Sequence, residues 1–250
     1  MQLIFGIGAL WATRNDVTGI GPDQFAILNE IQVDFEFEEK LLYGQFSFPL
    51  DAARGKGKVV GKAKSAQVFA ALYGDVFFGV TPTSGATLTA ENEAGTVPSS
   101  TPWTITVANA ATYVKDLGVF YAGGTGGRLK QVTSPSAVGQ YSVNQTTGIY
   151  TFFTGDAGAA VLISYRYTAT GGNSIAINNN FMGVTPTFEA DFHNAKSTLN
   201  GSGSLDLALY RCMSSKFSIP SRLDDYAIPE FDFTAMANAA GQIGLLSLSE

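Results

Sequence analysis

The side chains that most often carry out catalysis are scarce in this sequence. It contains one histidine, His193, and one cysteine, Cys212. A nucleophilic triad would have to use His193, but no serine lies in the Gly-x-Ser-x-Gly turn that exposes a nucleophile. One histidine and a distant cysteine also fall short of the ligand set of a zinc site. Cys212 lies between Tyr210 and Met213 in a strand-like run, which predicts a packed thiol rather than a reactive one.

A Gly/Lys-rich run at residues 53–63 raises the possibility of a phosphate-binding loop. Such a loop requires a glycine five positions before Gly61 and a serine or threonine after Lys62, to hold phosphate oxygens and magnesium. The sequence has Lys56 and Ala63 at those positions. The run therefore predicts a basic strand that pairs with acidic neighbours.

A glycan hydrolase would need two carboxylates that converge in a cleft. Asp224 and Asp225 are adjacent, and adjacent residues of an extended segment point to opposite sides. The sequence therefore predicts no catalytic residue, no metal site and no cofactor, and it favours a structural or binding protein over an enzyme.

The composition predicts a mainly β protein that hides much of its surface. Hydrophobic residues make up 45% of the 250 residues and charged residues 14%, against roughly 25% charged residues in an ordinary domain. Contacts between subunits are the simplest way to cover such a surface. The net charge is −6, so DNA would be a passing neighbour rather than a tightly bound ligand. A poor secretory signal and the lack of a long apolar stretch predict assembly in the cytoplasm.

Apolar and polar residues alternate along several segments, as in half-buried strands. In the first, Ile31, Val33, Phe35 and Phe37 alternate with polar residues, and residues 42–50 continue the pattern, which predicts a long hairpin. Further alternating segments lie at 188–192, 205–210, 228–233 and 243–248. Between them, Ser65 is a candidate N-cap for a helix over residues 65–73, with Val68, Phe69 and Leu72 as its apolar stripe.

The middle of the chain differs from its flanks. Residues 80–172 hold four acids and four bases, so the whole net charge lies in the flanking segments. Gly- and Thr-rich stretches mark both ends of this middle part. We expect a split core at 1–79 and 173–250 and an inserted β-sandwich at 80–172, with strands at 140–143, 149–152 and 161–167.

Two blocks resemble the tail tube (major tail) proteins of long-tailed bacteriophages. Residues 55–79, GKGKVVGKAKSAQVFAALYGDVFFG, are similar to the strand-to-helix segment of that family. Residues 205–250 resemble its closing strands, with a Ser-Lys turn, an Ile-Pro-x-Phe-x-Phe strand and a last short strand. The middle part resembles a β module inserted in some phage structural proteins.

The resemblance implies a virion protein that forms rings, usually hexameric, through sheets joined into an inner barrel. The rings stack into the tail tube through which DNA is ejected, and the long hairpin and terminal arms bridge to the next ring. The implied fold is a tail-tube-type β-sandwich or barrel core with one flanking α-helix, plus the inserted module on the tube exterior. Implied partners are other copies of the chain and the tape measure, terminator and distal tail proteins, with DNA passing through the lumen without specific binding.

Within that picture, the alternating acids and lysines receive separate roles. We expect acidic side chains to line the lumen: Asp34, Glu36, Glu38, Glu189, Asp191, Glu230 and Asp232. We expect a basic face between subunits: Lys56, Lys58, Lys62 and Lys64. Some of the acids are expected to pair with these lysines instead.

Besides an enzyme such as a glycan hydrolase, which would need the converging carboxylates described above, two other classes of protein remain open at this point. One is a carbohydrate-binding β-sandwich, a surface or decoration protein that uses Trp103, Tyr141 or Tyr150, and the insert alone could make such a contact with host-surface glycans. The other is a different virion part, such as a capsid decoration protein, a tail terminator or the tube of a contractile tail.

Overall fold

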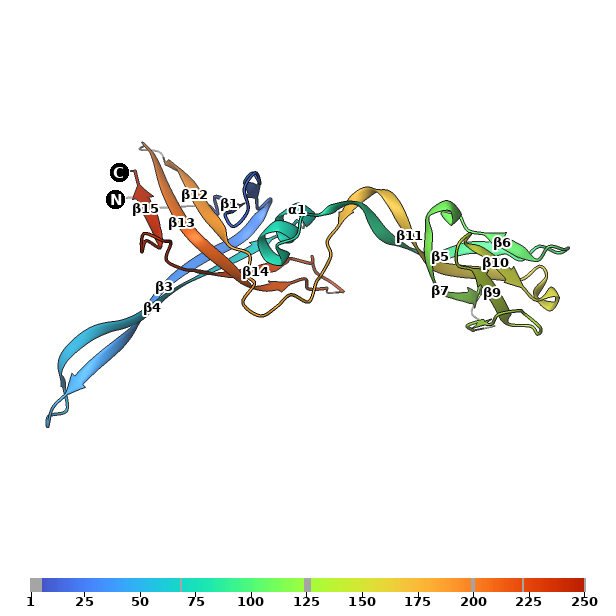
Figure 1. Cartoon of the computed structure of the whole chain (residues 1–250), viewed down its shortest axis with the longest axis horizontal. Helices are drawn as coiled ribbons and strands as arrows, with labels where there is room; N and C mark the ends of the chain where they lie inside the picture. Colours follow the sequence, from blue (N-terminus) through green and yellow to red (C-terminus); the bar gives the residue numbers. More distant parts are fainter. Residues whose placement is uncertain (1–5, 68, 124–126, 199–200, 222, 250) are drawn as a thin grey trace. The chain divides into compact units, whose positions relative to one another are not determined.

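The structure, a computed structural model, divides the chain into two compact units. It describes residues 6–67, 69–123, 127–198, 201–221 and 223–249. The first unit combines Met1–Pro82 with Ile175–Glu250, and the second is Thr83–Ser174. The sequence-based boundaries lie close to these, at residue 79 rather than 82 and at 172 rather than 174. We call the first unit the core and the second the insert (Figure 1).

One antiparallel sheet forms the core. Its strands follow the order β2 (Asp23–Gln24), β1 (Ala9–Arg14), β12 (Phe188–Thr198), β13 (Gly201–Ser218), β14 (Glu230–Ala235), β4 (Pro49–Ser65) and β3 (Leu28–Tyr43). A further strand, β15 (Gly244–Leu248), pairs with β13 at Leu205–Leu209. The alternating segments of the sequence thus form strands, and the predicted hairpin is β3–β4.

Aromatic residues dominate the apolar face of this sheet. Phe188, Phe231 and Phe233 are buried and lie within 6.1 Å of one another, measured between ring centroids. Phe25 and Tyr73 cover them from above the sheet, with centroid distances to Phe231 of 5.3 and 6.2 Å. Burying such side chains contributes about 1.5–3 kcal/mol each, and this face is therefore the main source of stability in the core.

The helical segment is shorter than the sequence predicts and begins later. It consists of α1 (Ala70–Tyr73) and a π-helical turn, η1 (Gly74–Phe78). The N-cap assigned to Ser65 is wrong, because Ser65 ends β4 and its hydroxyl donates to the carbonyl of Ala26 at 2.5 Å. Leu72 of the predicted stripe is buried, Phe69 is exposed, and Val68 lies outside the described residues. Among the described residues, no helix has the length and apolar character required to cross a membrane.

Aromatic rings from the neighbouring strands pack over two of the glycines of β4. Gly61 pairs with Phe233 of β14, whose buried ring occupies the space that a Cβ would need. At Gly57, a Cβ would come within 2.7 Å of the Phe37 ring, but Phe37 is exposed and can turn away. The alternating glycines therefore make room for side chains of this chain.

This difference predicts unequal effects of two otherwise similar substitutions. We expect Gly61→Ala to lower the free energy of unfolding by about 1–3 kcal/mol, because the packed Phe233 ring has no room to move. Gly57→Ala is the matched control and should change it by less than about 0.5 kcal/mol. Urea unfolding of both variants measures the difference, and equal effects would contradict this account of the Phe233 contact.

The insert is a small sandwich with its own core. One sheet has the order β5 (Thr83–Thr96), β11 (Ala160–Ser174), β7 (Tyr113–Tyr121). The other has the order β6 (Thr104–Thr106), β10 (Ile149–Phe152), β9 (Gln140–Asn144), β8 (Lys130–Gln131). The short 3-10 turns η2 (Ala110–Thr112) and η3 (Thr154–Asp156) complete it. Its buried residues form a cluster separate from that of the core, and the predicted strands of this region are confirmed.

The insert is joined to the core by two adjacent strand ends. Thr83, the first residue of β5, pairs with Ser174, the last residue of β11. The chain therefore leaves and re-enters the core at neighbouring points.

Candidate functional site

The core sheet carries its charged residues on the face opposite the aromatic core. On β3, β4 and β14, cross-strand partners on this face are Glu36 with Lys58, Gln32 with Lys62, and Asp232 with Lys62. On β12, Glu189 and Asp191 pair with Thr13 and Trp11 of β1 on the same face. Six of the seven acids assigned to the lumen therefore share one face by strand register: Asp34, Glu36, Glu189, Asp191, Glu230 and Asp232.

The lysines lie on this face too, between the acids. Lys58 pairs with Glu36 at 3.0 Å and Lys64 with Glu30 at 2.6 Å. The acids and the lysines of the sequence analysis are therefore interleaved within one chain, and the pairing expected for some of them is present. Exposed ion pairs of this kind contribute at most about 1 kcal/mol each to the stability of the fold. Their main effect is to hold the acidic and basic side chains in alternating positions on the face.

Glu38 and Lys56 lie where the hairpin register changes. Phe37 pairs with Gly57, but the next pair is Glu39 with Arg54, so β4 has one residue more than β3 at this point. Such a bulge bends a hairpin and increases its twist. Glu38 follows Glu36 on the same side of β3, and both Glu38 and Lys56 are exposed.

Three charged members of this face were not singled out from the sequence. They are Glu30, Asp206 and Lys216. Lys216 lies opposite Asp232 and forms an ion pair of 3.3 Å with Glu230. Glu30 has the same two-residue period as Asp34 and Glu36, which is a signal that the sequence offers. Asp206 alternates with Leu205 and Leu207, so the sequence offers the same signal for it. Lys216 follows a register shift between Ser214 and Lys216, so its face is not readable from the period alone.

Two acids at the β12 end of this face are partly withdrawn from water. Burial raises the pKa of Asp191, and burial together with the negative charge of Asp191 raises the pKa of Glu189. A raised pKa means that folding favours the protonated form of the carboxyl group. The group therefore contributes to stability at low pH, and this contribution is lost as the pH rises through its pKa in the folded chain.

We therefore expect Asp191→Asn to raise the thermal stability slightly at pH 7 and to have no effect below about pH 4. Asp206→Asn provides the opposite case, because the hydrogen bond from His193 lowers the pKa of Asp206. That substitution should reduce stability at pH 7. Melting curves of both variants between acid and neutral pH test the signs, and a destabilising Asp191→Asn would contradict them.

The one histidine lies in a row with a carboxylate and a serine on three neighbouring strands, but the three side chains do not have the order of a catalytic triad. His193 Nδ1 and Asp206 Oδ1 lie 2.5 Å apart on β12 and β13, and Ser247 of β15 is opposite Asp206. In a triad the histidine stands between the serine and the carboxylate, whereas here the carboxylate stands in the middle. Cys212 is buried, and burial raises the pKa of its thiol to about 12.

The structure also shows no metal set in the part of the chain it describes: no group of three or more His, Cys, Asp or Glu side chains there is arranged to hold an ion.

The hairpin extends beyond the strand that flanks it. β14 pairs with β4 at Val59–Lys64 only, so residues 38–58 form a two-stranded ribbon that we call the arm (Figure 1). Its apolar side chains are exposed, with Phe46 at 69% and Phe48 at 81%. The other exposed apolar residues of the arm are Leu41, Leu42, Tyr43 and Leu50. Exposed apolar residues gathered on one element mark an interaction surface.

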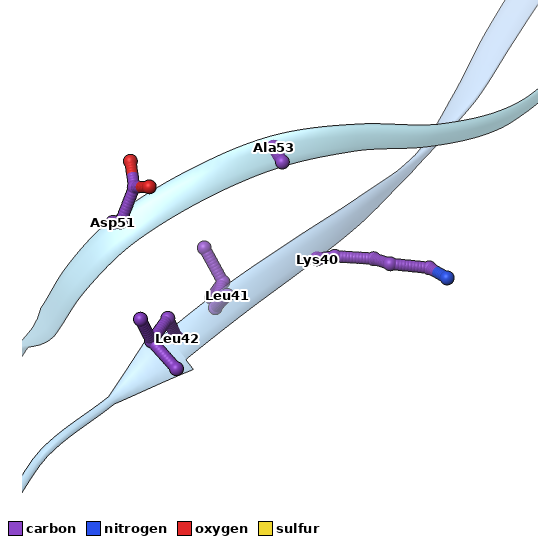
Figure 2. A pocket seen from close by; sticks show the side chains of 5 residues that line it. All are labelled: Lys40, Leu41, Leu42, Asp51 and Ala53. Carbon is purple, nitrogen blue, oxygen red and sulfur yellow. The ribbon is translucent and has the colours of Figure 1, made fainter.

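A shallow hollow lies on this arm. It has a volume of about 280 Å³ and is lined by Lys40, Leu41, Leu42, Asp51 and Ala53. Figure 2 shows the two leucines beside each other on β3, with the Lys40 side chain extending away from them. All five residues are exposed, so a small molecule here would be covered far less than the 70–90% typical of ligand pockets.

The aromatic residues considered for sugar binding lie in the core of the insert. Tyr141 and Tyr150 are buried, and their hydroxyls donate to Asp116 at 2.6 and 2.9 Å. Trp103 is half-buried and packs against the same cluster. Neither tyrosine ring therefore presents a free face on which a sugar could stack.

The edges of the two units differ. β3 ends the core sheet, so its outer edge has no strand partner among the described residues, and its register with β4 is unbroken from Glu30 to Phe37. In the three-stranded sheet of the insert, the outer strands β5 and β7 both pair with β11 through register shifts, and the outer strands of its other sheet, β6 and β8, are only three and two residues long. Irregular edges are poor templates for a further strand, whereas a long regular edge is a good one.

These features, an exposed apolar arm, a regular sheet edge and a mixed charged face, are the candidate functional surface of the chain. Comparison with known proteins adds no assignment to it. No protein-family model matches the sequence, and no curated protein is significantly similar to it.

Proposed function

We propose that this chain is the repeating subunit of a bacteriophage tail tube, which polymerises as stacked rings around a channel for DNA. The observation that carries the proposal is the arm, a ribbon whose large apolar side chains have no cover within the described chain. A soluble chain that keeps Phe46 and Phe48 exposed gains about 1.5–3 kcal/mol for each ring that a partner buries. A second copy is the partner that is always present at the required concentration.

The edge of the core sheet supports self-association of one particular kind. β3 carries Glu30, Asp34, Glu36 and Glu38. Two β3 strands side by side would bring like charges together, which is destabilising. Contacts between unlike surfaces are then favoured, and such head-to-tail contacts generate rings or helical filaments rather than simple dimers. A hexameric ring is the form we propose, in keeping with the resemblance.

The charged face suits the wall of a DNA channel. Proteins that hold DNA neutralise its phosphates with clustered lysines and arginines. Here lysines are interleaved with a larger number of acids, so passing phosphates meet no uninterrupted basic surface. In this arrangement the acids assigned to the lumen face DNA, and the insert, with its irregular edges, lies on the tube exterior, where it could contact host-surface glycans. The ends of the tube would contact the tape measure, terminator and distal tail proteins.

Negative-stain electron microscopy of the purified chain tests the proposal. Samples taken before and after long incubation at high concentration should show rings or hollow tubes several nanometres across. A monodisperse monomer at every concentration and ionic strength would contradict it. A glycan array with the purified chain would then test the carbohydrate-binding alternative.

A further inference from the structure

The lysines of β4 lie between two acidic strands in the core. Lys64 is opposite Glu230 on β14 and opposite Glu30 on β3. Lys62 is opposite Asp232 on β14 and opposite Gln32 on β3. The positive charge of Lys64 is stabilised from both sides, since Glu30 raises its pKa by a hydrogen bond and Glu230 adds to the shift. The order of charge across these strands is thus acid, base, acid.

In the arm, the same strand has only one of its two acidic neighbours. Lys58 pairs with Glu36, and Arg54 is opposite Glu39 with its guanidinium 4.8 Å from the centre of the Phe37 ring. On the other side β14 has ended, so the outer edge of residues 49–58 has no strand partner among the described residues. Its bases, Arg54, Lys56 and Lys58, lie at the end nearest the core, on both sides of the bulge in β4, whereas the end nearest the tip holds Pro49 and Asp51.

The outer edge of β3 has the complementary property. Its acids alternate along a regular stretch that pairs with β4 on one side only. Opposite charges directly across two strands contribute roughly 0.2–1 kcal/mol per pair, and like charges oppose pairing. An acidic edge therefore selects a basic strand, and residues 54–58 of the arm edge are a basic stretch without a strand partner among the described residues.

We propose that the basic part of the outer arm edge of one copy, residues 54–58, pairs with the outer edge of β3 of a second copy. The contact reproduces between chains the acid, base, acid order that β14, β4 and β3 have within one chain. It rests on the proposed self-assembly and deepens it by naming the two edges that meet. Because the edges differ, each copy donates one arm edge and receives another, and the contact repeats from copy to copy.

Mixtures of full-chain variants, each with one introduced cysteine beside the buried Cys212, test which edges meet. One set places a cysteine on β3, as Asp34→Cys or Glu38→Cys, and the other on the arm, as Arg54→Cys or Lys56→Cys. Strand neighbours have Cα atoms about 4.5–5.5 Å apart, within the reach of a disulfide. Under mild oxidation of assembled samples, we expect covalent dimers in mixtures of the two sets and little product from either set alone. Lys115→Cys, on the insert, is the matched control and should form none.

The outcomes separate this inference from the proposed function. If the unsubstituted chain forms no rings or tubes, both are overturned. If it assembles but cysteines on β3 link only to cysteines on β3, or no mixed dimer forms, only the pairing of the arm with β3 is overturned.

Charge reversal gives a second, independent measurement. Lys56→Glu should raise the concentration required for assembly by about tenfold, because it replaces an attraction with a repulsion at each contact. Lys115→Glu is the control for the same charge change on an exposed lysine of the insert, and it should leave that concentration unchanged. Equal behaviour of the two variants would overturn the proposal.

Discussion

Replacing the two aromatic residues at the tip of the arm should leave a folded monomer that no longer forms tubes. In the double variant Phe46→Ser/Phe48→Ser, the monomer loses no buried contact, because both rings are mostly exposed. Its free energy of unfolding should therefore change by less than about 0.5 kcal/mol. Assembly should suffer strongly, since two rings that a partner would bury contribute about 1.5–3 kcal/mol each to every contact.

Sedimentation and electron microscopy measure this effect. The concentration required for tubes should rise by about a hundredfold or more, because every 1.4 kcal/mol is about a tenfold change in an equilibrium constant. Phe120→Ser/Val138→Ser is the matched control, since it removes two exposed apolar side chains from the insert. Tubes that form at the original concentration in the tip variant would show that the arm is not the assembly element.

Removal of the insert should leave a core that still folds and still assembles, into thinner tubes. Thr83 and Ser174 are antiparallel partners, so a short Gly-containing turn can join the two strand ends as in a hairpin. The core keeps its own buried cluster, and the excised insert keeps its own. The isolated insert should be a folded monomer, because its outer strands are irregular (β5 and β7) or very short (β6 and β8).

A second excision that retains part of the paired strands is the control for a faulty junction. It places the turn between Ala86 and Ala169, which are also partners. Tube diameters from electron microscopy and melting curves of both excised forms decide the outcome. Tubes of unchanged diameter would contradict the exterior position proposed for the insert, and loss of folding in both forms would contradict the independence of the core.

The strands were predictable from the sequence because burial on one face leaves a two-residue period. Phe231 and Phe233 alternate with Glu230 and Asp232, and the structure buries the first pair. The two-residue period shows which residues of one strand share a face, but it does not show which residues of the neighbouring strand lie opposite them. That the lysines of β4 stand among the acids depends on pairing between segments far apart in the sequence, such as Glu230 with Lys64.

The helix boundary was not predictable for a related reason. Ser65 has the chemistry of an N-cap, yet its amide donates to the carbonyl of Pro229 at 3.2 Å and its hydroxyl to that of Ala26. Both partners are distant in sequence, and they extend β4 at the expense of the helix. The burial of Tyr141 and Tyr150 was not readable from the sequence either, because it depends on Asp116, which accepts hydrogen bonds from both hydroxyls and makes burial of these polar rings favourable.

The adjacency of Thr83 and Ser174 has a consequence for the order in which the chain folds during synthesis. β4 cannot complete its pairing until β14 has emerged from the ribosome, and the chain between them includes the whole insert. An insert that folds first brings its two ends together and removes its own length from that loop. Each halving of a loop lowers the entropic cost of closing it by about 0.6 kcal/mol. Folding of the insert ahead of the core would therefore shorten the search of β4 for β14.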